Sequence, residues 1–166
     1  LSQAEQIIKK IEEMILYNRF GKRLYYQRLF RFYSVIDTYK ALEYFYLFKN
    51  TRRDICSDCR ACEQADMVRL FFRIGDRARA NELARPVLDG TLECHDVPRN
   101  VQLLYLQQAL DYKDLAKAAP LAEALYRKSK LGDPSDLGYF GAVLRYFAFT
   151  APRKAKKILK HFLLSW

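Results

Sequence analysis

Apolar side chains recur along this chain with two nested periods. Five alanines follow one another at intervals of 37 to 39 residues, and apolar residues stand three, four and seven places after each of them. The short period is that of one face of a helix. The long period is typical of stacked helical hairpins, because each hairpin buries its apolar face only against its neighbours. The alanines are Ala4, Ala41, Ala80, Ala118 and Ala155.

Capping residues and helix breakers divide the chain into about nine helices. Ser2 to Glu5 spells a capping box that opens the first helix. Asp96 is expected to cap a later helix, and Gly75 to end one. We expect Pro86 to bend or shorten the end of its helix. The predicted elements are a leading helix over residues 1–17 and four hairpins over residues 22–49, 59–88, 97–129 and 134–166.

Small residues at the start of each second helix, together with Gly75 and Asp76 ahead of Ala80, carry a family resemblance. This pattern resembles the tetratricopeptide repeat (TPR) family, and the likeness covers nearly the whole chain. The resemblance implies an all-α fold, a right-handed superhelix of antiparallel helical hairpins, that is, a TPR-like α-solenoid. It also implies a concave groove that binds peptides or protein segments.

Composition fits one domain with a sizeable core, since 51% of the 166 residues are hydrophobic and 14% are aromatic. Lys or Arg interrupts every apolar stretch before it reaches the length of a membrane span. We therefore expect a soluble, cytoplasmic protein without a membrane partner. The net charge of +10 divides into +6 over residues 1–53, −1 over residues 54–133 and +5 over residues 134–166. Such a field attracts acidic partners and polyanions.

The leading helix corresponds to the second helix of a hairpin whose first helix does not precede it. Its stripe of Ile7, Ile8, Ile11 and Ile15 is expected to leave an apolar edge exposed. The chain is then expected either to associate through this N-terminal helix or to be a fragment that continues upstream in a longer protein.

The cysteines form a candidate metal site. Cys56, Cys59 and Cys62 make a C-x2-C-x2-C run, and Cys94, which precedes His95, follows Cys56 by 38 residues, one repeat. Equivalent positions of stacked units lie about 10 Å apart, so the two loops can meet. Four of these five side chains would satisfy a tetrahedral, structural zinc that bridges two repeats. Reduced free thiols, an iron–sulfur cluster and a redox disulfide remain alternatives.

No catalytic constellation is visible, because His95 and His161 fall in different units and no nucleophile motif or phosphate-binding loop occurs. We therefore expect a non-enzymatic scaffold or adaptor that captures an acidic or amphipathic peptide. The alternative is binding of single-stranded RNA or DNA by the basic ends, where Arg and Tyr interleave. The candidate partner-binding residues are Tyr25, Arg28, Arg31, Tyr33, Arg69, Arg73, Gln107 and Arg145.

Overall fold

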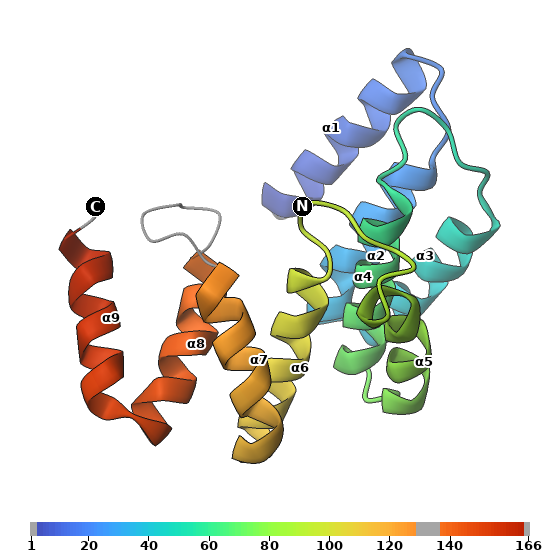
Figure 1. The fold of residues 1–166 in the computed structure, drawn as a ribbon. Helices are drawn as coiled ribbons and strands as arrows, with labels where there is room; N and C mark the ends of the chain where they lie inside the picture. Colours follow the sequence, from blue (N-terminus) through green and yellow to red (C-terminus); the bar gives the residue numbers. More distant parts are fainter. Residues whose placement is uncertain (1–2, 129–136, 165–166) are drawn as a thin grey trace. The chain divides into compact units, whose positions relative to one another are not determined.

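The computed structural model describes residues 3–128 and 137–164, which form nine α-helices and no strand (Figure 1). The prediction of an all-α chain with about nine helices is thus confirmed for this part of the chain. None of these helices is long and apolar enough to cross a membrane. The helices are α1 (Gln3–Tyr17), α2 (Arg23–Ile36), α3 (Thr38–Asn50), α4 (Arg60–Arg73), α5 (Arg77–Leu88), α6 (Arg99–Asp111), α7 (Leu115–Lys128), α8 (Leu137–Thr150) and α9 (Pro152–Leu164).

Helices that follow one another closely in sequence pack together. The sequential pairs in contact are α1 with α2, α2 with α3, α4 with α5, α6 with α7, α7 with α8, and α8 with α9, and α2 also contacts α4 and α6 contacts α8. A single residue, Asp37, separates α2 from α3, and Gly75 ends the α4 region in the left-handed conformation with φ of 83°. The boundary expected between residues 129 and 134 lies outside the described residues.

Three of the repeated alanines are among the fully buried positions of the second helices. Ala41, Ala80 and Ala118 are 0% exposed, and each is the fourth residue of its helix, α3, α5 or α7. An aspartate precedes each helix and accepts a hydrogen bond from the backbone N–H three residues later, as an N-cap does. Cap and alanine therefore recur together. The three caps are Asp37, Asp76 and Asp114.

The chain divides into two compact units, residues 1–97 and 98–166. In the first unit, the ring of Phe45 packs edge-to-face on Phe30 and on Phe71, with centroids 6.0 Å and 5.3 Å apart. In the second unit, side chains of α6 to α9 form a separate core around Leu125 and Phe147. Each unit therefore buries an apolar core of its own.

Two local predictions have different outcomes. Pro86 lies within α5 without shortening it, because the helix reaches its predicted end at Leu88. The predicted cap by Asp96 is wrong, because α6 has Pro98 as N-cap without a side-chain hydrogen bond. Cys94 and Val97 instead close a turn by exchanging two backbone hydrogen bonds of 3.2 Å. This turn places Asp96 two residues before the N-cap of α6.

The leading helix α1 leaves part of its apolar stripe exposed. Ile15 is 6% exposed, whereas Ile7 is 58% exposed. Glu12 fastens α1 to α2, since it pairs with Lys22 at 2.9 Å and accepts a hydrogen bond from the Tyr25 hydroxyl. The exposed edge expected from the sequence is therefore present at Ile7.

Candidate functional site

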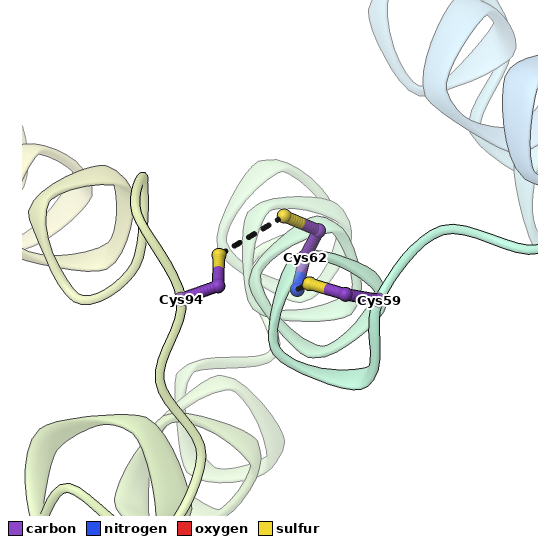
Figure 2. Close-up of side chains that lie close together, drawn as sticks. All are labelled: Cys59, Cys62 and Cys94. Atoms are coloured by element: carbon purple, nitrogen blue, oxygen red, sulfur yellow. Dashed lines mark hydrogen bonds between the residues drawn. The ribbon is translucent and has the colours of Figure 1, made fainter.

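Three of the four cysteines meet at the N-terminus of α4 (Figure 2). Cys59 is the N-cap of α4, and its Sγ accepts a hydrogen bond of 3.3 Å from the backbone N–H of Cys62. The C-x2-C spacing thus places both thiols on one helical turn. The Sγ atoms of Cys59, Cys62 and Cys94 all lie within 4.8 Å of one another. We call these three residues the thiol cluster.

Cys94 joins the cluster through the turn that ends the first unit. Its Sγ lies 3.5 Å from that of Cys62, at hydrogen-bonding distance, and Figure 2 shows the two sulfurs facing each other from separate segments. Burial favours a higher pKa for the Cys94 thiol, but hydrogen bonds from the N–H of Asp96, from Cys62 and from the N–H of Val97 lower that pKa. Burial, reinforced by hydrogen bonds with Cys59 and Cys94, raises the pKa of Cys62. The turn therefore favours a thiolate at Cys94.

Cys56 and His95, the two other predicted ligands, lie outside this group. Asp54 fastens the loop of Cys56, because its carboxylate accepts hydrogen bonds from the N–H groups of Gly21 at 2.6 Å and of Cys56 at 3.1 Å. The His95 side chain is 92% exposed, and its Nδ1 lies 3.2 Å from Asp96. Of the five candidate ligands, the structure brings together three.

The thiol cluster has the donor set of a soft-metal site. Three sulfurs at these distances are close enough to hold a metal ion. Thiolates suit zinc, whose tetrahedral coordination leaves one further position beside three cysteines. The backbone N–H groups that already point at Cys59 and Cys94 are the kind of outer contact that orients metal-bound sulfur.

A buried ion-pair network lies next to the thiol cluster, and sequence reasoning missed it. Arg23 of α2 donates to both carboxylate oxygens of Glu63 at 3.0 and 2.9 Å, and to the carbonyl oxygens of Phe48 and Thr51. Arg53 also pairs with Glu63. Because Glu63 directly follows Cys62, this network fixes the first turn of α4. The signal available in the sequence was the separation of 40 residues between Arg23 and Glu63, close to one repeat.

Four of the predicted partner-binding residues line the contact between α2 and α4, and we call them the arginine surface. Two aspartates form ion pairs with three of these arginines. Arg28 pairs with Asp58 at 3.3 Å, while Arg31 and Arg69 pair with Asp66 at 3.4 and 3.5 Å. Farther along the contact, the guanidinium of the fourth arginine donates to the Ser34 hydroxyl at 2.8 Å. The arginine surface consists of Arg28, Arg31, Arg69 and Arg73.

Asp66 lies almost buried under the arginine surface. Burial raises the pKa of its carboxyl, while Arg31, the Gln27 amide and Arg69 oppose that rise. Gln27 bridges the two aspartates, donating to Asp66 at 2.7 Å and to Asp58 at 2.9 Å. Carboxylates therefore hold three of the four guanidinium groups in place, those of Arg28, Arg31 and Arg69.

The other four predicted partner-binding residues lie elsewhere. The Tyr25 hydroxyl donates to Glu12 of α1, and the Tyr33 ring stacks on Tyr44 of α3 at 5.3 Å. Tyr25 thus faces α1 and Tyr33 faces α3, rather than α4. Gln107 is exposed on α6, and Arg145 pairs with Asp111 at 2.8 Å, both within the second unit.

Comparisons with protein-family models, with curated proteins and with solved structures find no match to this chain.

Proposed function

We propose that this chain is a non-enzymatic, TPR-like scaffold whose arginine surface captures an acidic peptide segment. The observation that carries the proposal is the arginine surface itself. The surface contains four guanidinium groups but only two carboxylates pair with them, so it keeps an excess of positive charge. The side chains of Arg28 and Arg31 remain 37% and 38% exposed. Preorganised guanidinium groups bind carboxylates in bidentate geometry at a small entropic cost.

Support for the repeat architecture comes from contacts that recur one repeat apart. Gln27 bonds to Asp66, Ser34 to Arg73, and in the second unit Asn100 to Tyr139, each across 39 residues. The contacts of α2 with α4 advance along both helices in the same direction, as in a stack of equivalent hairpins. The right-handed superhelix is part of the proposal.

A peptide partner is favoured over single-stranded nucleic acid. Binding of unpaired bases needs aromatic rings that are available for stacking. Tyr44 already stacks on Tyr33 and on Tyr26, with centroids 5.3 and 6.5 Å apart. The most exposed tyrosines described in the first unit, Tyr17, Tyr39 and Tyr46, belong to α1 and α3. The arginine surface belongs to α2 and α4, and it suits carboxylates better than bases.

The test is fluorescence anisotropy with a short labelled peptide rich in glutamate. The same peptide with glutamine in place of glutamate is the ligand control. Exchange of Arg31 and Arg73 for Gln is expected to weaken binding about tenfold, because two charged contacts are lost. The matched variant Lys156→Gln with Lys160→Gln removes the same charge from the exposed face of α9, and should change affinity less than about twofold.

Two outcomes would contradict the peptide proposal. One is an equal loss of affinity in both double variants, which would indicate an unspecific charge effect. The other is tighter binding of a labelled oligothymidylate than of the acidic peptide, with a steep dependence on salt, which would favour the nucleic-acid alternative.

The proposal includes a structural zinc ion held by the thiol cluster. Zinc would supply a cross-link between α4 and the turn at Cys94, and thereby stabilise the part of the first unit that carries the arginine surface. A cytoplasmic location also belongs to the proposal, because thiols stay reduced there. The metal has no catalytic task in this scheme.

Metal analysis of the purified protein tests the zinc site. We expect about one zinc per chain, and loss of most of it in Cys59→Ser, Cys62→Ser or Cys94→Ser. Cys56→Ser and His95→Ala are the matched controls, since both side chains lie outside the cluster. Retention of zinc in Cys94→Ser, or its loss in Cys56→Ser, would overturn this assignment of ligands.

A further inference from the structure

Cys62 and Cys94 are placed for a reaction with each other as well as for metal binding. Their sulfurs lie 3.5 Å apart without a bond between them. A disulfide bond is about 2.05 Å long, so an approach of roughly 1.5 Å would form one. Cys94 sits on a surface turn whose neighbours Glu93, His95 and Asp96 are exposed. Val97 at the end of the turn is buried and anchors it, so the shift falls on the segment from Glu93 to Asp96.

We propose that Cys62 and Cys94 form a reversible disulfide when the protein meets hydrogen peroxide or a related peroxide. In the presence of metal the same reaction would expel it, because a disulfide sulfur is not a thiolate ligand. The expulsion rests on the zinc site proposed above, whereas the disulfide needs only the two thiols.

The chemistry balances with one peroxide for each disulfide. One thiolate attacks a peroxide oxygen, so that an S–O bond forms, the O–O bond breaks and hydroxide leaves. The second thiolate then attacks the sulfenic sulfur, the S–S bond forms, and a second hydroxide leaves. The two thiol protons convert both hydroxides to water. Two electrons pass from the sulfurs to the peroxide.

Cys59 is less suited to the bond than Cys94, although it belongs to the cluster. It shares a helical turn with Cys62, and its sulfur caps α4 by accepting the N–H of Cys62. A Cys59–Cys62 bond would disturb this cap. The Cys62–Cys94 bond instead joins two segments that already face each other (Figure 2). It would tie α4 to the end of the first unit, as the metal would.

Peptide mapping identifies the bond directly, because trypsin separates the cysteines. Cleavage after Arg and Lys, except before Pro86, places Cys62 on residues 61–69, Cys94 on residues 80–99, and Cys56 with Cys59 on residues 54–60. The full chain is reduced, freed of metal by a chelator, and treated with an equivalent of hydrogen peroxide. Remaining thiols are alkylated before digestion. The expected main product is the cross-linked pair 61–69 with 80–99, which a reductant separates.

Three variants and one stability measurement complete the test. Cys59→Ser should lose the metal yet keep the cross-link, Cys94→Ser should lose both, and Cys56→Ser should lose neither. In the metal-free wild type, oxidation should raise the melting temperature by roughly 10 °C, since the bond closes a long loop. The peptide mapping needs no metal. The disulfide can therefore be tested even if the protein binds no zinc.

A main product that links 54–60 to 61–69, or peroxide consumption that ends in sulfinic acid without any cross-link, would overturn the proposal. So would a cross-link that persists in the Cys94→Ser variant. If the cross-link forms but no preparation of the protein contains zinc, the result would support the disulfide and reject the metal site.

Discussion

At the scale of single residues, the contact between α2 and α4 buries two carboxylates with different partners. Glu63 pairs with Arg23 and Arg53. Asp66 pairs with Arg31 and Arg69, whose side chains are partly exposed to solvent. A buried carboxylate without close, well-aligned partners is costly, because desolvation is only partly compensated. Asp66 is therefore the residue at which pH should change stability most visibly.

The first prediction concerns this pH dependence. Burial raises the pKa of Asp66 above 3.8, so folding favours the protonated form. Its contribution to stability is then fully present below about pH 4 and is lost as the pH rises through the folded-state pKa. Asp66→Asn keeps the shape without the ionisation. Urea unfolding across this range should show that the stability of the wild type relative to the variant falls as pH increases.

A difference that stays constant, or that grows with pH, would contradict this reasoning. The variant Asp89→Asn is a control for which the opposite pH dependence is expected, because hydrogen bonds from Thr91 lower the pKa of the exposed Asp89 carboxyl. The stability of the wild type relative to Asp89→Asn should therefore increase with pH.

At the scale of elements, the second helices share one start. Asp37, Asp76 and Asp114 each cap a helix whose fourth residue is a fully buried alanine. The cap fixes where the helix begins, and the alanine allows the helix to approach its neighbour closely. In α9, Ala151 and Pro152 stand in place of the cap, and Ala155 is only half-buried. The repeat is therefore strongest in α3, α5 and α7.

The second prediction tests the cap of α3. Asp37→Ala removes the acceptor for the Lys40 N–H and should lower the free energy of unfolding by about 1 kcal/mol. Asp37→Asn keeps an acceptor and should restore most of that loss. Chemical denaturation of the three proteins measures the difference. An Asn variant as unstable as the Ala variant would show that charge, rather than capping, accounts for the effect.

At the scale of the whole molecule, the thiol cluster lies entirely within the first of two compact units. In repeat proteins each segment is stabilised mainly by its nearest neighbours. A cross-link at Cys94 should therefore act on α4 and on residues 89–97, and much less on α8 and α9.

The third prediction is that metal removal loosens only this part of the chain. After treatment with a chelator, amide hydrogen exchange in α4 and in residues 89–97 should accelerate about tenfold or more, while exchange in α8 and α9 stays unchanged. Mass spectrometry of the full-length chain locates the change. The Cys59→Ser variant should not respond to the chelator. A uniform acceleration over all helices would contradict a local role.

Local sequence patterns predict the helices and most of their boundaries. Helical periodicity, capping aspartates and the stop at Gly75 depend on side chains within a few residues of each other, so they can be read locally. The shared helical turn of Cys59 and Cys62 is equally local. The repeat placed the loop of Cys94 beside that of Cys56, whereas in the structure Cys94 meets Cys59 and Cys62 and Cys56 lies outside the group.

Which side chains face one another depends on tertiary packing. Cys56 belongs to the same spaced run as Cys59, but Asp54 ties its loop to Gly21, and His95 turns outward. Likewise, arginines and tyrosines of α2 separated into a face toward α4 and a face toward α1 and α3. These choices depend on the rotation of each helix about its axis and on partners about 39 residues away, which a local pattern does not specify.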